Sequence, residues 1–274
     1  MAEHGLDTIG PVVLIGAGKM GLALARGWVK AGLPPRELVL VDPLPGPATA
    51  AFARETGVRL LASPAGVLVA VLVLAIKPQM MAEVLPGLRP LVGPQTLVIS
   101  IAAGISMATI GAGLGTTRVI RTMPNTPAQI GKGVAGAVPG AGATPRDRAA
   151  ATALLGAVGE VVWVDSESQI DAVTAVSGSG PAYVFHFVEA LAAAAMRQGF
   201  APTEAMRLAR QTVIGAAALL EADPTPAATL RQNVTSPAGT TEAALGVLMA
   251  PDGLTSLMEK TVLAARLRSE ELGR

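Results

Sequence analysis

The chain of 274 residues is 51% hydrophobic but only 3% aromatic, carries a formal net charge of +1 and contains no cysteine. The lack of cysteine excludes a disulfide framework, a thiolate nucleophile and a cysteine-ligated zinc or iron–sulfur site; since His4 and His186 lack metal-ligand spacing, no metal is predicted. Because no basic run interleaved with aromatic residues accompanies the balanced charge, no nucleic-acid partner is expected.

The N-terminal segment and the apolar runs bear on location. Glu3 and Asp7 stand where a signal peptide would carry positive charge. The longest uncharged, strongly apolar stretch, Ala65–Ile76, is shorter than the roughly 20 residues that a membrane-spanning helix needs. A cytoplasmic protein that does not enter the membrane is therefore expected.

The first half of the chain alternates short β-rich runs with helical patterns, which is typical of a parallel doubly wound sheet buried on both faces. The runs predicted as strands are Pro11–Ile15, Glu37–Val41, Val67–Ile76, Thr96–Ile101 and Arg118–Arg121, with further short ones at Gly133–Val138 and Val161–Val164. Helical patterns begin near Met20, Thr49 and Gln79. The sequence therefore predicts an α/β fold with a Rossmann-type dinucleotide-binding domain over residues 1–165.

The first strand runs into Gly16-Ala17-Gly18-Lys19-Met20-Gly21, a G-x-G-x-x-G sequence that opens an apolar helix. The glycines allow a tight turn, a close approach of the backbone to a pyrophosphate, and close packing of helix on strand, while the helix N-terminus offers unpaired N–H groups to an anion. The motif alone is common. At the start of a βαβ unit, with Asp42 ending the second strand, it predicts a dinucleotide site.

Asp42 bears on which dinucleotide binds. A carboxylate at this position suits the ribose hydroxyls of NAD and repels a 2′-phosphate, and Pro43-Leu44-Pro45-Gly46 after it contains no lysine or arginine. The alternative interpretation is that Asp42 only opens an Asp-Pro turn. The cofactor is expected to be NADPH or NADH, with a preference towards NADH.

Three further strand ends carry residues suited to a ligand. Ala75-Ile76-Lys77-Pro78 turns the chain after the strongest strand, and Lys77 is either a phosphate or carboxylate ligand or a solvated surface residue. Ser100–Gly104 is a small-residue segment that lets backbone approach the cofactor. Arg121–Pro127 contains two prolines that fix a rigid turn. Together they predict a cleft at the carboxyl ends of the strands.

The second half, residues 166–274, is predicted to be an all-helical domain. Apolar residues recur at helical spacing over Gln169–Gly199, Thr203–Glu221, Thr240–Met249 and Asp252–Leu272. Ser177–Pro181 interrupts the first stretch with two glycines and a proline, which lower helix stability. Their presence therefore predicts a kink or a close contact at this point. Asn233–Thr241 is a polar loop opening a helix, which Thr240 or Ser236 could cap and whose N–H groups could hold a carboxylate. The Ala-rich helices imply an exposed apolar face, and hence at least a dimer.

Five motifs, in the same order and over about Val12–Gly273, resemble the pyrroline-5-carboxylate reductase family. They are the glycine loop, Lys77-Pro78-Gln79, Arg121–Pro127, Ser177–Tyr183 and Thr235–Thr241. The resemblance implies reduction of 1-pyrroline-5-carboxylate to L-proline by NAD(P)H, the last step of proline synthesis. It also implies that the helical domain forms a homodimer, commonly within a larger ring, with the active site between the cofactor domain and the dimer helices.

The resemblance also assigns site residues. The expected cofactor residues are Asp42, which follows from its place after the second strand, and a set implied by the resemblance. That set is Gly16, Ala17, Gly18, Lys19, Met20, Gly21, Ala75, Ile76, Lys77, Pro78, Ala102, Ala103 and Asn233. The substrate residues are Glu167, Gly239, Thr240 and Thr241. Thr241 is expected to hydrogen-bond the ring nitrogen, with Glu167 acting through water, while the backbone ending at Thr240 holds the carboxylate. Alternatively, Glu167 only favours the start of a helix.

Two departures from the family pattern concern the substrate loop. Ala238 stands where the family usually has a second glycine, which matters because alanine tolerates positive φ poorly. Met249 replaces a commonly acidic residue later on the same helix. Neither removes a side chain assigned to the chemistry.

Two other functions are compatible with the fold. A 2- or 3-hydroxyacid dehydrogenase usually needs a lysine or histidine base in the helical domain, but Asp171–Leu248 contains no lysine and only His186. A non-catalytic dinucleotide sensor would bind cofactor without turnover and would not need the Thr240-Thr241 loop. Hydride addition to a protonated imine, by contrast, needs neither a nucleophile nor a metal, because the cofactor supplies the hydride.

Overall fold

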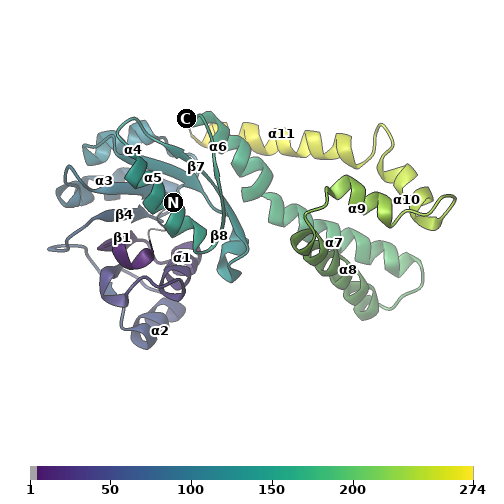
Figure 1. The fold of residues 1–274 in the computed structure, drawn as a ribbon, viewed down its shortest axis with the longest axis horizontal. Helices are drawn as coiled ribbons and strands as arrows, with labels where there is room; N and C mark the ends of the chain where they lie inside the picture. Colours follow the sequence, from purple (N-terminus) through teal and green to yellow (C-terminus); the bar gives the residue numbers. More distant parts are fainter. Residues whose placement is uncertain (1–4, 274) are drawn as a thin grey trace. The chain divides into compact units, whose positions relative to one another are not determined.

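The computed structural model describes residues 5–273, and within them the chain forms an eight-stranded sheet (Figure 1). Glu3 and His4 lie outside the described residues. The strands are β1 (Val12–Ile15), β2 (Leu38–Val41), β3 (Arg59–Leu61), β4 (Val71–Leu74), β5 (Leu97–Ser100), β6 (Val119–Met123), β7 (Gly133–Pro139) and β8 (Gly159–Trp163).

The strand order is β3-β2-β1-β4-β5-β6-β7-β8, and every neighbouring pair is parallel except β6 and β7. The predicted doubly wound sheet is confirmed. The antiparallel pair was not predicted; it follows from the short connection over residues 124–132, because a parallel pair needs a crossover of a dozen or more residues. The predicted strand Val67–Ile76 is too long, since only Val71–Leu74 pairs in the sheet, and the short edge strand β3 was not predicted.

Helices cover both faces of the sheet, and the strand side chains alternate between two apolar cores. Leu14 faces the core shared with α1 (Lys19–Lys30), α2 (Pro47–Thr56) and α5 (Pro145–Gly156), whereas Val13 faces the core shared with α3 (Met81–Leu88) and α4 (Met107–Leu114). Four consecutive residues are fully buried in each of β1, β2, β4 and β5, which explains why these strands read as continuous apolar runs.

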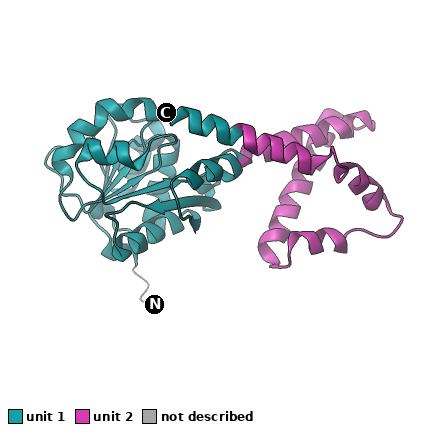
Figure 2. Cartoon of the chain, turned by 90° about the horizontal axis from the view of Figure 1, so that it is seen from above, with its two compact units in different colours: residues 1–179, 265–274 teal, residues 180–264 magenta. Residues whose placement is uncertain are grey.

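The chain divides into two compact units, coloured separately in Figure 2. Unit 1 comprises residues 1–179 and 265–274, and unit 2 comprises residues 180–264. This division by contacts differs from the domains expected from the sequence, and the boundary at Asp165 stays a prediction. Within residues 5–273, every helix is too short or too polar to span a membrane.

The helices expected in the second half are confirmed, with one addition. They are α6 (Ser168–Val173), α7 (Gly180–Arg197), α8 (Pro202–Ala222), α9 (Ala227–Asn233), α10 (Thr240–Leu248) and α11 (Leu254–Leu272), of which α9 was not predicted. The glycine-rich interruption is a π-helical turn at Thr174–Gly178 between α6 and α7. Such turns occur frequently at functional sites.

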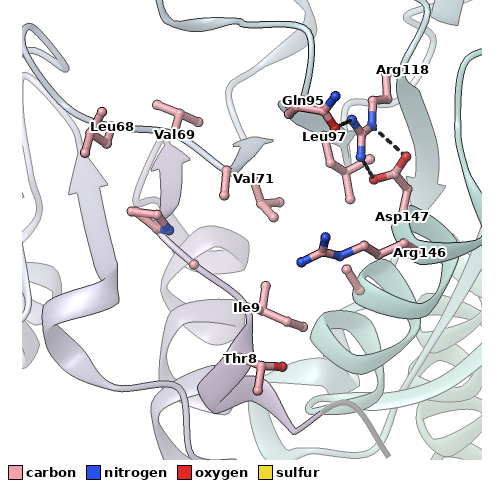
Figure 3. Close-up of a pocket in the computed structure, with 14 residues that line it drawn as sticks. Thr8, Ile9, Leu68, Val69, Val71, Gln95, Leu97, Arg118, Arg146 and Asp147 are labelled. Atoms are coloured by element: carbon pink, nitrogen blue, oxygen red, sulfur yellow. Dashed lines mark hydrogen bonds and ion pairs between the residues drawn. The ribbon is translucent and has the colours of Figure 1, made fainter. Parts of the chain in front are cut away.

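A buried ion pair lies at the amino ends of the strands, beside a cavity of about 780 Å³ (Figure 3). Arg118 donates two hydrogen bonds of 2.7 Å to Asp147, whose side chain is only 4% exposed. Thr144 donates two more from its backbone N–H and its hydroxyl, each 2.8 Å long. Burial raises the pKa of Asp147, but the bonds from Arg118 and Thr144 outweigh it and hold the pKa below its ordinary value.

We expect Asp147→Asn to lower the free energy of unfolding by about 3 kcal/mol at pH 7, because it leaves Arg118 without its anion. The pKa of Asp147 is depressed in the folded state, so its stabilisation is present above the unfolded pKa of about 3.9 and is lost as the pH falls through the folded value. Urea unfolding at pH 7 measures the free energy lost in the variant. The same measurement at pH 3 shows how much of the stabilisation by Asp147 is lost in acid. The exposed Asp165→Asn is the matched control, and equal stability of the two variants at pH 7 would contradict the expectation.

Candidate active site

Two glycines of the loop after β1 are required by close contacts, and the third borders open space. Gly16 has a φ of +90°, and a Cβ there would lie 2.6 Å from the carbonyl oxygen of Ala75 at the end of β4. A Cβ at Gly21 would overlap the carbonyl oxygen of Gly16, so this glycine allows α1 to pack on the strand. Gly18 is exposed, and a Cβ there would meet nothing within 4 Å. The open space at Gly18 faces outward and can receive a ligand close to the backbone.

The start of α1 leaves backbone donors available. Gly18 is the N-cap, with no capping side chain, and α1 begins at Lys19. The first N–H groups of such a helix lack intrahelical acceptors and attract an anion. The loop therefore fits the pyrophosphate of a dinucleotide in both shape and charge.

Asp42, at the end of β2, is fastened to the glycine loop. Its Oδ2 accepts a hydrogen bond of 2.9 Å from the N–H of Ala17, and its Oδ1 accepts one of 3.0 Å from the N–H of Leu44. Thr49 donates to the carbonyl oxygen of Ala17 at 2.8 Å. The carboxylate therefore has a structural role in the turn, which agrees with one of the two interpretations and leaves the ribose role as a prediction.

The remaining predicted cofactor residues of unit 1 follow neighbouring strands at the same edge of the sheet. Ala75–Pro78 follow β4, whose neighbours are β1 and β5, and Lys77 is exposed. Ala102 and Ala103 follow β5, and the N–H of Ala102 donates to the hydroxyl of Ser100 at 3.3 Å. The order β2-β1-β4-β5 brings the carboxyl ends of these strands together at the point where the winding reverses, which is where doubly wound folds bind ligands.

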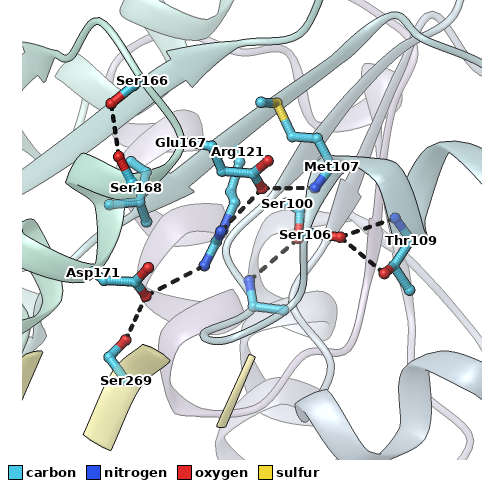
Figure 4. A network of polar contacts seen from close by, with 12 residues as sticks. Ser100, Ser106, Met107, Thr109, Arg121, Ser166, Glu167, Ser168, Asp171 and Ser269 are labelled. Carbon is cyan, nitrogen blue, oxygen red and sulfur yellow. Dashed lines mark hydrogen bonds and ion pairs between the residues drawn. The ribbon is translucent and has the colours of Figure 1, made fainter. Parts of the chain in front are cut away.

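Glu167 lies in unit 1 within a network of charged groups (Figure 4). Its Oε1 accepts a hydrogen bond of 2.7 Å from the N–H of Met107 and one of 2.9 Å from Arg121. The second guanidinium nitrogen of Arg121 lies 3.9 Å from Asp171. Glu167 is thus fixed at the first residue of α4. Its other oxygen can hold a water molecule, so the expected role through water stays a prediction.

Asn125, in the two-proline turn after β6, holds the π-helical turn. Its side chain donates to the carbonyl oxygen of Ser177 at 3.2 Å and accepts from the N–H of Val134 at 2.9 Å. A Cβ at Gly178 would lie 3.1 Å from the side chain of Met123. The glycine-rich motif is therefore packed closely against β6, which explains the need for a small residue inside a helical stretch.

The loop before α10 belongs to unit 2, together with Asn233 at the end of α9. The N-cap of α10 is Gly239, and no side chain caps the helix, so the expected cap by Thr240 or Ser236 is wrong. Glu242 instead reaches back and accepts a hydrogen bond of 2.7 Å from the N–H of Ala238. The first N–H groups of α10 are thereby left for another acceptor, as a carboxylate-binding loop requires.

Ala238, which stands where the family usually has glycine, adopts a left-handed backbone conformation. Its φ is +55°, and it is the only described residue other than glycine with a positive φ. A left-handed conformation costs an alanine roughly 1–2 kcal/mol, part of which is offset because glycine loses more entropy on folding. The loop before α10 therefore carries local strain.

We expect Ala238→Gly to stabilise the protein by about 0.5–1 kcal/mol, because glycine adopts this conformation without steric cost. Thermal unfolding measures the effect as a higher Tm. Ala112→Gly is the matched control, since Ala112 is exposed and lies inside α4, where glycine is less favourable than alanine, so we expect it to lower the Tm. A lower Tm for both variants would contradict the expectation.

Sequence reasoning missed three residues that organise the site: Arg121, Asn125 and Ser269. A signal existed for Arg121, a charged residue inside an apolar strand that is only 6% exposed. Asn125 stood in a turn expected to be rigid and to hold two small polar side chains at the cleft, but it was given no role of its own. Ser269 carried no signal, because its partner Asp171 is 98 positions away in the sequence.

The arrangement can bind a dinucleotide in unit 1 and a small carboxylate in unit 2. The predicted substrate residues include one carboxylate and two hydroxyl groups, and no lysine or histidine. Hydroxyl groups orient and hydrogen-bond a substrate, and Oε1 of Glu167 already accepts hydrogen bonds from Met107 and Arg121. This suits a reaction in which the bound cofactor provides the reactive hydrogen.

Comparisons with known protein families agree with this reading. The family model for pyrroline-5-carboxylate reductase dimerisation matches residues 167–272. The family model for NADP oxidoreductase, coenzyme F420-dependent, matches residues 11–104. The two matches cover the helical second half and the first part of the sheet.

Similar proteins were found over nearly the whole chain. A pyrroline-5-carboxylate reductase of Pseudomonas aeruginosa is 41% identical over 95% of this chain and 96% of that protein. One of Methanosarcina acetivorans is also 41% identical, over 95% of this chain and 97% of that protein. The solved structure of a pyrroline-5-carboxylate reductase from Coxiella burnetii superposes with a TM-score of 0.89 at 33% identity, covering 97% of this chain and 99% of that one. A Plasmodium falciparum pyrroline carboxylate reductase solved with NADP bound gives a TM-score of 0.81 at 26% identity, covering 98% and 100%.

Proposed function

The chain belongs to the pyrroline-5-carboxylate reductase family, and from that premise we propose which of its residues carry out the reaction. The protein is an NAD(P)H-dependent oxidoreductase that reduces 1-pyrroline-5-carboxylate to L-proline, the last step of proline synthesis. The observation that carries the assignment is the glycine loop after β1, where close backbone contacts require Gly16 and Gly21 and open space at Gly18 leaves room for a dinucleotide.

The residues of unit 1 hold the cofactor in this proposal. Gly16–Gly21 and the start of α1 bind the pyrophosphate, and Ala75–Pro78 with Ala102 and Ala103 line the nicotinamide side. Asp42 lies at the adenosine ribose, where its charge favours NADH over NADPH. When bound, the nicotinamide supplies a hydride to the imine carbon.

The residues of unit 2 hold the substrate. The N–H groups at the start of α10, from Gly239 to Thr241, bind the carboxylate, which the absence of a capping side chain leaves possible. The hydroxyl of Thr241 hydrogen-bonds the ring nitrogen, and Asn233 completes the cofactor site. Holding the imine in line with the cofactor lowers the barrier by several kcal/mol.

Glu167 acts on the ring nitrogen through a water molecule in this proposal. Its Oε1 is held by Met107 and Arg121, so its second oxygen is fixed in direction. The substrate nitrogen is basic and can enter already protonated, so no residue has to donate a proton directly.

The proposal is tested by following the loss of NADH and, separately, NADPH absorbance when 1-pyrroline-5-carboxylate is added to the purified protein. We expect oxidation of both cofactors, with proline as product and a higher kcat/KM for NADH. Cofactor binding without oxidation would contradict the reaction and favour the sensor interpretation. Loss of NADH or NADPH with a 2- or 3-oxo acid, which is reduced to the hydroxy acid, but not with 1-pyrroline-5-carboxylate would favour the dehydrogenase alternative.

We further propose that unit 2 forms a homodimer with a second copy of the chain. The buried hydrophobic residues of positions 180–264, all of which the structure describes, are three alanines: Ala192, Ala205 and Ala209. Large apolar side chains there are exposed instead, among them Phe185 at 64%, Ile214 at 53% and Leu219 at 62%. A monomer would leave this surface in water, whereas an obligate interface would bury it.

We expect light scattering of the purified protein to show a dimer or a higher assembly of dimers at micromolar concentration, because the exposed apolar area of unit 2 is buried only by association. A monodisperse monomer would contradict this. The ring of dimers, the cytoplasmic location and the lack of a nucleic-acid partner stay predictions.

A further inference from the structure

The loop between β5 and α4, residues 101–106, is held at two points by parts of unit 1 that lie far away in the sequence. Its middle residue, Gly104, has a φ of +72° and packs against the end of α11, where a Cβ would lie 3.1 Å from the carbonyl oxygen of Leu272. At its end, the N–H of Met107 donates to Glu167 at 2.7 Å. We name this segment the β5–α4 loop.

The last turn of α11 is itself anchored by a buried hydrogen bond. The hydroxyl of Ser269 donates to Oδ1 of Asp171 at 2.7 Å, and Ser269 is only 6% exposed. Asp171 lies 3.9 Å from Arg121, and Arg121 bonds Glu167 at 2.9 Å (Figure 4). A continuous chain of charged and polar groups thus connects the end of α11 to the start of α4.

The groups in this chain have few other hydrogen-bond partners that could replace one that is removed. Arg121 is 6% exposed, and its Nε has no hydrogen-bond partner among residues 5–273, so the guanidinium depends on its two carboxylates. Without the Ser269 hydroxyl, the side chain of Asp171 would keep, among residues 5–273, the longer contact to Arg121, and the last turn of α11 would lose its hydrogen bond to α6. Gly104 would then lose the backbone that it packs against, because Leu272 and Gly273 belong to the same turn.

We propose that the last turn of α11, anchored through Ser269 to Asp171, is a positioning element that sets the affinity for the nicotinamide cofactor by fixing the β5–α4 loop. The inference rests on the proposed function, which places Ala102 and Ala103 of this loop against the cofactor. Ser269 is a positioning residue, since it acts through Asp171 and the helix end and touches no reacting group. Packed and hydrogen-bonded chains of this kind couple sites by amounts that change affinity several-fold.

The test compares Ser269→Ala with Ser63→Ala, which removes the same atom from an exposed serine of unit 1. Fluorescence titration measures the Kd for NADH, and steady-state rates give kcat at saturating NADH. We expect Ser269→Ala to raise the Kd and the KM for NADH about fivefold with kcat within about twofold, and Ser63→Ala to change neither. Ser269→Cys fills the same space without a strong donor, so we expect it to raise the Kd as well.

Amide hydrogen exchange supplies a second readout that is independent of turnover. We expect faster exchange within the β5–α4 loop in Ser269→Ala and no change there in Ser63→Ala. A Kd unchanged in both Ser269 variants would overturn the inference while the wild-type activity upholds the proposed function. A wild-type protein that binds neither NADH nor NADPH would overturn the proposed function and the affinity role together, and the exchange data would still decide whether α11 fastens the loop.

Discussion

Replacing Thr241 by alanine is expected to lower kcat/KM for 1-pyrroline-5-carboxylate by about 10²-fold, with the Kd for NADH unchanged. The hydroxyl is proposed to hydrogen-bond the ring nitrogen, whose charge and geometry change as the imine becomes an amine. A donor or acceptor placed at such an atom is worth roughly 10²–10³ in rate when it is removed. Its loss should appear mainly in kcat, because the carboxylate stays bound to the backbone at the start of α10.

Two further variants make this prediction specific. Thr241→Ser keeps the hydroxyl and should retain most of the activity, within about tenfold of the wild type. Thr229→Ala makes the same change at an exposed position of α9 in unit 2 and should leave kcat/KM unaltered. Unchanged catalytic efficiency in Thr241→Ala would remove the role given to this hydroxyl. A loss in Thr229→Ala of similar size would show that the effect is one of folding.

The parts of the site that the sequence predicts are those governed by local rules. The glycine loop could be identified because tight turning, close backbone approach and helix packing each demand glycine at a fixed spacing. The strands of the central sheet could be identified because burial on both faces selects continuous apolar runs. The strain at Ala238 could be anticipated from a single residue type at a position that needs positive φ.

The features that could not be predicted from the sequence depend on connections and contacts beyond the local pattern. The antiparallel β7 resulted from the length of a connection, and α9 resulted from a short stretch between prolines and a polar loop. Neither Thr240 nor Ser236 caps α10, and Glu242 instead accepts the N–H of Ala238 because the turn before the helix places the two residues together. No local sequence feature distinguishes Ser269, because its role depends on the hydrogen bond to Asp171, which is distant in the sequence.

Cofactor preference is expected to reverse in a double variant of the turn after β2. Asp42→Asn removes the charge proposed to repel a 2′-phosphate but keeps one oxygen for the bond from Ala17. Leu44→Arg adds a cation at a side chain that is 88% exposed, so the fold should tolerate it. The two changes together should shift the NADPH-to-NADH ratio of kcat/KM by about 10²-fold towards NADPH. Removing the repulsion of the 2′-phosphate and adding an attraction to it together contribute roughly 3 kcal/mol near the surface.

Steady-state rates with each cofactor at fixed 1-pyrroline-5-carboxylate measure this ratio. Asp42→Asn alone should shift it by about tenfold, chiefly through a lower KM for NADPH, because only the repulsion is removed. Leu68→Arg adds the same charge at another exposed leucine of unit 1, 80% exposed, and should not alter the ratio. A ratio that stays constant in the double variant would mean that Asp42 serves only the turn, where it accepts the N–H groups of Ala17 and Leu44. A shift in both Asp42 variants that is absent from Leu68→Arg would place the ribose beside Asp42, because charge acts on cofactor choice only at short range.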